Sequence, residues 1–370
     1  MPLFNSVKPT SNLVRPCFTS FTRYLEKFLH SDCDLISELE NRLATLHDVK
    51  DCVTFNSGFW GLALLIDSLH IRGKTQVILP SLTYRRMADI ISWCGLVPYF
   101  CDIEKATLAN SARTVRACLN ENTALIIGVH PVGGHCDISG LEELSEAEGI
   151  PLLFDSVESV CETHKGKRIG SFGAAELFSL GASKLINGFE GGYVTTNDSS
   201  LAEELRLKRM GLGNGLTLSV EMPPFHAAMA LAALDDLPDQ LARNRLRFER
   251  YREGLKELHG LRLLEQDLDT EPSYKNIVVE VLDAWPLTRD ETVQIMNSEN
   301  ILARAYYYPP LTHSPIAYRH VSSDLPNTDW AANKFISMPC GHLVSLDDIS
   351  KIIGFLRNVS DGKAIYSEQI

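Results

Sequence analysis

One lysine in the chain has neighbours suited to a reaction at its amine. Lys184 lies in FSLGASKLINGFEGGYVTTND, after the small residues Gly181, Ala182 and Ser183 and before a glycine-rich stretch that leads into a predicted strand. An amine that attacks an aldehyde must be neutral and partly desolvated, and small neighbours leave room for the aldehyde. Taken alone, the same residues also fit a surface lysine before a β-turn.

A carboxylate precedes this lysine at the end of an apolar segment. Asp155 closes PLLFD, a predicted buried strand, and lies 29 positions before Lys184. Open parallel sheets bind ligands beyond the carboxyl ends of their strands, where a carboxylate can keep a pyridine nitrogen protonated. An aspartate that caps a helix is the alternative interpretation.

Two turns and one aromatic residue could complete a site for a flat, phosphorylated ligand. In NSGFWG a strand gives way to a helix, so the backbone N–H groups of Gly58 and Phe59 could hold a phosphate, and the hydroxyl of Ser179 could add to them. Tyr84, just after the predicted strand QVILP, could stack on an aromatic ring. Singly, these residues also fit an ordinary βα turn, a small turn serine and a core tyrosine.

The segments that position these residues alternate between strands and helices. Apolar strands are predicted, with helices between them, near 52–56, 76–80, 96–103, 123–130 and 151–155. Such strands indicate a mostly parallel sheet covered on both faces. The residues before Asp34 are expected to be irregular, and Asp34 to cap a helix.

The pattern changes near residue 235, where a long charged helix begins. Beyond it KNIVVEVL and ARAYYYPPL are predicted strands, and ETVQIMNSEN and SLDDISKIIGFLRNV are predicted helices. The predicted fold class is therefore α/β, with a large α/β domain over residues 1–245 and a smaller α+β C-terminal domain over 246–370.

Composition narrows the class of partner. The 370 residues carry a net charge of -12 without a basic stripe, which argues against binding to nucleic acid or to an anionic membrane surface. Nine cysteines occur without CxxC pairs or zinc spacing, so we expect no metal site and reduced thiols in a cytoplasmic protein. No segment approaches the length of a membrane span.

Together, the order of these segments resembles the DegT/DnrJ/EryC1/StrS family of pyridoxal-phosphate-dependent sugar aminotransferases. The resemblance covers roughly residues 34–360 and rests on DLISELENRLATLHDVKDCVTFNSG, VILPSLTY, HPVGGHCDISGLEELSEAEGIPLLFDSVES, FSLGASKLINGFEGGYVTTND and ISMPCGHLVSLDDISKII. It implies the fold-type-I transferase fold, pyridoxal 5′-phosphate as cofactor and a homodimer with shared active sites.

The resemblance also implies roles for the candidate residues. Lys184 would form the internal aldimine and move the proton, and Asp155 would hold the pyridine nitrogen. The predicted cofactor-binding set is Lys184, Asp155, Gly58, Phe59, Tyr84, Ser179 and Glu158. The reaction implied is the transfer of an amino group from glutamate or glutamine to a keto acceptor, foremost a nucleotide-linked keto sugar.

Several positions depart from the family pattern. Glu158 stands where the family has Gln or His, and Phe59 replaces a threonine of the SGT turn. The segment that usually completes the neighbouring subunit's site has Ser219 and Glu221, with Asn214 as a possible substitute. These departures leave open an amino-acid-like substrate, converted by elimination, replacement or cyclisation.

Two further alternatives are a catalytically idle regulatory relative and a binding module without the cofactor. The Lys184–Asp155 combination argues against both, and Lys184 also argues against the dehydratases that lack this lysine. On the acceptor side of the site, Tyr306, Tyr307, Tyr308 and His313 are candidates, with packing between the domains as the alternative.

Overall fold

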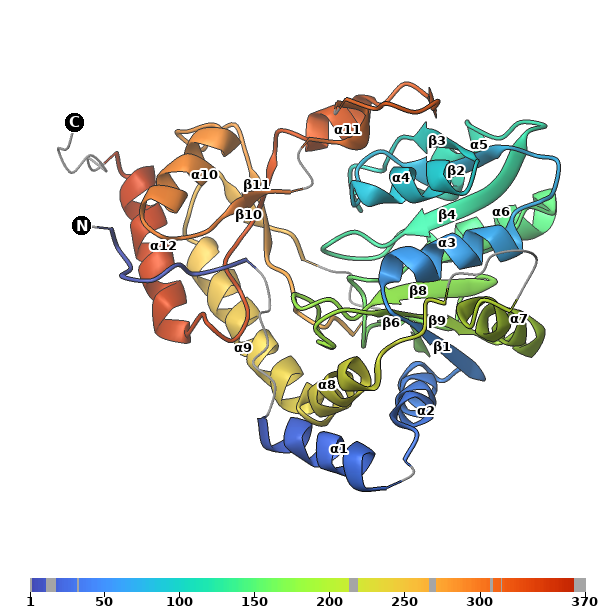
Figure 1. The fold of residues 1–370 in the computed structure, drawn as a ribbon. Coiled ribbons are helices and arrows are strands. Elements are labelled where there is room, and N and C mark those ends of the chain that lie inside the picture. Colours follow the sequence, from blue (N-terminus) through green and yellow to red (C-terminus); the bar gives the residue numbers. More distant parts are fainter. Residues whose placement is uncertain are drawn as a thin grey trace.

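Two β-sheets, each covered by helices, make up most of the molecule. The computed structural model describes residues 2–10, 18–31, 33–212, 219–265, 271–306, 309–313 and 315–362. An eight-stranded sheet lies on the right of Figure 1 and a four-stranded sheet on the left, with helices α8 (Pro224–Asp235) and α9 (Leu237–Leu255) at their lower junction.

The large sheet is mostly parallel, as the sequence predicts. In spatial order its strands are β1 (Asp51–Phe55), β9 (Gly192–Thr196), β8 (Ala175–Ser179), β5 (Leu152–Asp155), β4 (Thr123–Val129), β2 (Gln76–Pro80), β3 (Val97–Cys101) and β13 (Val321–Ser322). From β8 to β13 in this order each neighbouring pair is parallel, whereas β9 runs antiparallel to both β8 and β1. The antiparallel return arises because no helix intervenes between β8 and β9, so the chain folds directly back.

Helices cover both faces of this sheet, and successive residues of a strand point to opposite faces. In β4, Ile126 joins one apolar core, whereas Leu125 and Ile127 join the other. Helices α2 (Leu35–His47), α6 (Ile138–Glu148) and α8 supply the first core, and α3 (Gly58–Leu69), α4 (Arg86–Trp93) and α7 (Ser199–Arg209) the second. Smaller elements are α5 (Ala112–Arg116), β6 (Thr163–His164) and β7 (Lys167–Arg168).

The expectation that the chain before Asp34 is irregular is wrong. Helix α1 spans Phe18–His30 and packs against α8, with Phe21 and Tyr24 buried. Asp235, at the end of α8, binds Arg23 and the Tyr24 hydroxyl at 2.6 and 3.2 Å. The helix therefore depends on tertiary contacts with a segment some 200 positions away. The pattern of its own residues does not reveal such contacts.

The small sheet is antiparallel and has its own apolar core. Its spatial order is β10 (Leu261–Leu263), β11 (Val278–Val281), β14 (Phe335–Ser337) and β12 (Arg304–Ala305). Helices α10 (Arg289–Ser298), α11 (Pro326–Ala331) and α12 (Leu346–Ser360) and the 3₁₀ turn Leu311–His313 belong to the same part of the chain. Helix α9 contributes Phe248, Tyr251 and Leu255 to this core. The domain boundary predicted after residue 245 therefore lies within this helix, and the division into two domains stays a prediction.

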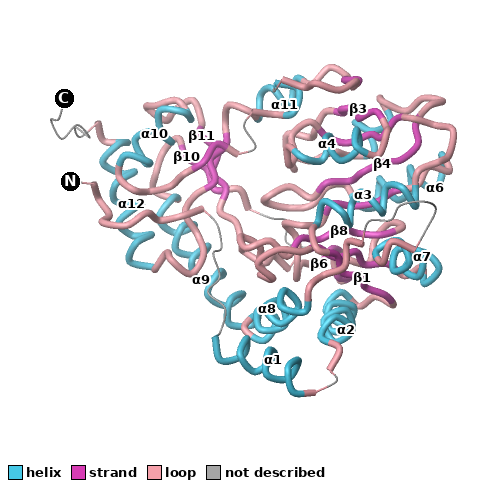
Figure 2. The backbone as a smooth tube through the Cα atoms, in the orientation of Figure 1, coloured by secondary structure: helices cyan, strands magenta, loops and turns pink. Residues whose placement is uncertain are grey.

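The C-terminal helices follow the prediction, but one strand is shorter. In ARAYYYPPL only Arg304–Ala305 is strand, and Tyr307 and Tyr308 lie outside the described residues. Figure 2 shows how much of the path between the two sheets consists of loops. Within the described ranges, no helix combines the length and apolar character needed to cross a membrane.

Candidate active site

Lys184 lies in the turn that follows strand β8. Its backbone N–H donates to Gly181 O at 2.8 Å, which closes the turn, and its side chain is 23% exposed. The ammonium group donates to Glu158 Oε1 at 2.7 Å. Glu158 comes three residues after the end of β5, so parallel pairing of β5 with β8 brings the two side chains together.

The second oxygen of Glu158 binds two residues from the C-terminal part of the chain. Glu158 Oε2 accepts from Lys275 Nζ at 2.6 Å and from Asn276 Nδ2 at 3.0 Å. The Lys275 side chain is only 5% exposed. The sequence did not reveal this residue, because a single lysine at the start of the predicted strand KNIVVEVL carries no local sign of chemistry.

Charge and burial act against each other in this cluster. Burial raises the pKa of Glu158, but the two lysines lower it more, so the carboxyl remains ionised. Burial also lowers the pKa of Lys184, yet Glu158 raises it overall and favours the ammonium form. For Lys275, burial together with the like charge of Lys184 lowers the pKa despite the pull of Glu158.

Asp155 lies at the carboxyl end of β5, buried beside Glu158. Burial raises its pKa from 3.8 to about 6, against the lowering effects of a backbone hydrogen bond and of Lys184. That hydrogen bond comes from Val157 N to Asp155 Oδ1 at 3.2 Å. The contact is of the turn-capping kind considered as the alternative, and it coexists with a position at the sheet edge facing Lys184.

Three chain segments meet at the start of helix α3. Ser57 caps this helix, which begins at Gly58, and a β-carbon at Gly58 would lie 3.8 Å from Ser179 Oγ. Gly192 approaches the same turn from β9. The Phe59 ring points into an aromatic group, with ring centroids 5.3 Å from Trp60 and 6.2 Å from Trp93. Only backbone groups of Phe59 therefore remain for an anion.

A cavity of about 330 Å³ lies between the two sheets and contains the lysine pair. It is lined by Thr10, Tyr84, Val132, Glu158, Ser183, Lys184, Lys275, Asn276, Ile277, Arg304, Ala305, Tyr306, Ser337 and Met338. Asp155, Gly58, Phe59 and Ser179 do not line it. Tyr84 is 49% exposed, so it is not a core tyrosine.

The residues predicted for the acceptor side separate in the structure. Tyr306 lines the cavity, and its hydroxyl accepts from Val132 N at 3.0 Å. His313 does not line the cavity; its Nε2 pairs with Asp329 Oδ1 at 2.8 Å. Arg304 reaches the cavity from β12. Its backbone pairs with β14, but its guanidinium group has no hydrogen-bond or ion-pair partner among the described residues.

The predicted partner-subunit segment is only partly described. Ser219 Oγ donates to Glu221 Oε2 at 3.1 Å on an exposed stretch of chain, and Asn214 lies outside the described residues. In the part of the chain that the structure covers, no group of three His, Cys, Asp or Glu side chains could hold a metal ion.

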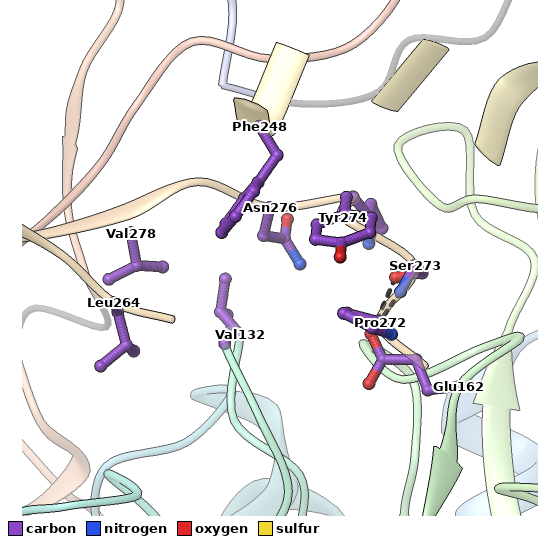
Figure 3. Close-up of a pocket in the computed structure, with 11 residues that line it drawn as sticks. Val132, Glu162, Phe248, Leu264, Pro272, Ser273, Tyr274, Asn276 and Val278 are labelled. Atoms are coloured by element: carbon purple, nitrogen blue, oxygen red, sulfur yellow. Dashed lines mark hydrogen bonds between the residues drawn. The ribbon is translucent and has the colours of Figure 1, made fainter. Parts of the chain in front are cut away.

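A smaller pocket adjoins the lysine cluster and shows how the segment carrying Lys275 is held. Figure 3 shows Glu162 directed at Ser273, whose N–H and hydroxyl donate to Glu162 Oε1 at 3.1 and 2.8 Å. Its other oxygen pairs with His135 Nε2 at 2.7 Å. The pocket volume of about 20 Å³ suits a single water molecule rather than a ligand.

The arrangement fits a cofactor with a pyridine ring, an aldehyde and a phosphate. The buried Asp155 has a raised pKa because its charge is poorly compensated, and a protonated pyridine nitrogen would compensate it. The start of α3 offers backbone N–H groups beside the Ser179 hydroxyl. The cavity volume lies within the roughly 300–1,000 Å³ typical of small-molecule sites.

Known proteins are similar to this chain in sequence and fold over nearly its whole length. A model of the DegT/DnrJ/EryC1/StrS aminotransferase family matches residues 20–357. The chain is 27% identical to GDP-perosamine synthase of Vibrio cholerae over 333 residues, which is 87% of this chain and 90% of the relative. It is 25% identical to dTDP-4-amino-4,6-dideoxy-D-glucose transaminase of Escherichia coli over 348 residues, or 90% and 93% of the two chains.

A solved structure supports the same relationship. The crystal structure of DesI, determined in the presence of its TDP-sugar product, has a TM-score of 0.90 and 27% identity, and covers 98% of this chain and 95% of its own. The fold-type-I prediction is thus confirmed. The chain belongs to the DegT/DnrJ/EryC1/StrS aminotransferase family and is a pyridoxal-phosphate-dependent aminotransferase.

Proposed function

We propose that this aminotransferase moves an amino group from glutamate or glutamine to a nucleotide-linked keto sugar. The observation that carries the proposal is the amine of Lys184 on the wall of a cavity, with Asp155 buried behind it at the end of β5. The names of the relatives support the acceptor class, because one makes a GDP-linked and the other a dTDP-linked amino sugar.

Each cofactor group has a matching residue in the proposed site. Asp155 would hold the pyridine nitrogen, Tyr84 would lie against the ring, and Ser179 with the backbone of Gly58 and Phe59 would bind the phosphate. When bound, pyridoxal phosphate supplies an electron sink for the pair left at the substrate carbon. The chain itself supplies position, charge and a base.

Lys184 is the base in this proposal. Its Nζ takes a proton from the carbon that carries the nitrogen, and returns a proton in the opposite half of the reaction. The amine must be neutral to do so. Burial in the cavity favours the neutral amine because it lowers the pKa of Lys184, whereas Glu158 acts against it and raises that pKa overall. The small neighbours predicted to give it room, such as Ser183, line the same cavity.

Arg304 is proposed to bind an anionic group of the substrates. It lines the cavity from the small sheet and has no partner among the described residues. Glutamate carries carboxylates and a nucleotide-linked sugar carries a diphosphate, and a guanidinium binds both through paired hydrogen bonds.

A homodimer in the cytoplasm is also proposed. Phe189 and Phe225 stack with ring centroids 5.6 Å apart, yet are 36% and 48% exposed, an apolar surface that a second subunit would cover. Eight cysteines within the described residues are free thiols, in keeping with a reducing compartment.

The first experiment separates transamination from the alternatives. Protein loaded with pyridoxal phosphate is incubated with glutamate or glutamine, and pyridoxamine phosphate and the oxo acid are measured by mass spectrometry. Both products are expected with one of these donors, and transfer to nucleotide-linked keto sugars should follow. Unchanged cofactor with both donors would refute the proposal.

A second measurement tests the lysine directly. Borohydride reduction followed by peptide mass spectrometry should place the cofactor on Lys184. The variant K184M should lose the attachment and at least about 100-fold of the amino transfer, since a positioned proton donor contributes about 10²–10⁴-fold. Attachment at another lysine would contradict the assignment.

A further inference from the structure

Glu158 joins the two halves of the cavity through a single carboxylate. One oxygen accepts from Lys184 Nζ at 2.7 Å, and the other accepts from Lys275 Nζ at 2.6 Å and Asn276 Nδ2 at 3.0 Å. The carboxylate is largely enclosed, with its side chain 11% exposed. All three donors therefore act on a charge that water screens poorly.

This carboxylate creates a difficulty for the reactive amine. A negative charge in contact with Lys184 favours its ammonium form, and an ammonium ion is neither a nucleophile nor a base. If Lys184 were the sole counter-ion of Glu158, its deprotonation would leave an unpaired buried carboxylate, which is strongly unfavourable. A second cation reduces this penalty, because the carboxylate keeps Lys275 and Asn276 as donors when Lys184 loses its proton.

Lys275 is built into the structure in a way that suits this purpose. Its side chain is only 5% exposed, and its ammonium group lies 2.6 Å from Glu158 Oε2. The preceding residues are anchored separately, because Ser273 donates to Glu162 through both its N–H and its hydroxyl (Figure 3). Glu158 and Glu162, from the same connection after β5, therefore hold the Lys275 segment at two points.

We propose that Lys275 is a positioning residue that partly offsets the charge of Glu158 and thereby makes the amine of Lys184 easier to deprotonate for reaction with the cofactor aldehyde. The proposal rests on the proposed attachment of the cofactor to Lys184. It also explains how a carboxylate can stand at position 158, where the family has Gln or His. Glu158 and Lys275 together carry no net charge, as an uncharged side chain would.

Besides Glu158 and Lys275, three other polar groups lie near Lys184, namely Asp155, Tyr84 and Arg304. Asp155 and Tyr84 raise the pKa of Lys184 to a smaller extent than Glu158 does, and Lys275 lies across the same carboxylate. Arg304 lines the same cavity from β12. None of these groups changes in the variants below except Glu158 and Lys275.

The test measures how fast cofactor-free protein forms its covalent bond to pyridoxal phosphate, with loss of water, as a function of pH. Samples are trapped with borohydride, and the labelled Lys184 peptide is quantified by mass spectrometry. In K275M the pH midpoint should rise by about one unit, or about tenfold slower attachment below the midpoint, in line with the usual effect of a neighbouring charge. E158Q and the double variant E158Q/K275M should both fall at or below the wild-type midpoint.

A matched control separates this effect from general destabilisation. Lys208 is a paired lysine on α7 with a side chain 8% exposed, and its Nζ lies 2.7 Å from Asp67 Oδ2. K208M should lower the melting temperature without moving the midpoint. A wild-type midpoint in K275M, or a raised midpoint in the double variant, would overturn the role of Lys275. Absence of Lys184 labelling in the wild type would instead overturn the proposed function on which it rests.

Discussion

Gly192 touches the backbone of Gly58, and no side chain fits between them. A β-carbon at residue 192 would lie 2.5 Å from Gly58 Cα and 2.6 Å from Gly58 N. Gly192 pairs with Phe55 on one side and Ser179 on the other, so it lies between the two strands that lead to the proposed phosphate site. The start of α3 is thus set by the absence of a methyl group.

The variant G192A should displace the start of α3 and weaken cofactor binding. Overpacking of this kind costs about 1–3 kcal/mol, so we expect the dissociation constant for pyridoxal phosphate to rise about 5–150-fold if the whole cost falls on the binding site. Equilibrium dialysis of the cofactor measures it. The control is G354A in α12, where a β-carbon meets nothing within 4 Å and alanine should leave binding unchanged. Equal binding by G192A and the wild type would contradict the assigned phosphate site.

The variant D155N should stabilise the cofactor-free protein while weakening cofactor binding. The folded-state pKa of Asp155 is raised from 3.8 to about 6, so its favourable contribution is complete below pH 3.8 and is lost as the pH rises through 6. At pH 8 the free energy of unfolding of cofactor-free D155N should exceed that of the wild type by an amount of order 3 kcal/mol, and its melting temperature should be higher. The difference should vanish toward pH 4. A lower melting temperature of D155N at pH 8 would show that the carboxylate is compensated within the protein.

Acid should destabilise the protein through His47, a residue of α2 remote from the reaction. Burial lowers its pKa from 6.5 to about 4, and its Nε2 lies 3.0 Å from the Tyr193 hydroxyl. The unfolded chain therefore binds the proton first, and the free energy of unfolding should fall by about 3 kcal/mol between pH 6.5 and 4. Urea titrations of H47Q should show a shallower decline over this interval than those of the wild type, and an equal decline would contradict the role of His47.

The variant R304A should impair substrate use more than cofactor attachment. Loss of a charge-assisted hydrogen bond costs about 1.5–3 kcal/mol, so KM for the substrate that Arg304 binds should rise about 10–100-fold. Steady-state kinetics with donor and acceptor varied in turn identify which substrate it is. R319A, at an exposed arginine that does not line the cavity, is the control. Unchanged KM for both substrates would remove Arg304 from the site.

The large sheet was predictable because its strands carry their environment in their own composition. Leu152, Leu153 and Phe154 are apolar in succession, as is typical of a strand buried on both faces. Helix α1 was missed because its stability comes from α8 and Asp235 rather than from its own residues. Asp34, in contrast, caps α2 through local hydrogen bonds and was predicted.

The site divides in the same way. Asp155 and Glu158 follow β5, and Lys184 follows β8, which is the parallel neighbour of β5 in the sheet. The resemblance of the segments, in their order, to the family predicted that these residues share a site. Lys275 lies 117 positions beyond Glu158 and reaches it from the other sheet. Its importance depends on a charge pair across the cavity, which neither periodicity nor a motif expresses.

The shared carboxylate of Glu158 makes the charge on Lys184 depend on both parts of the chain. Glu158 and Lys184 follow strands of the large sheet, whereas Lys275 and Asn276 belong to the segment just before β11 of the small sheet. A substitution that shifts this segment, even one outside the cavity, should therefore change how readily the amine gives up its proton.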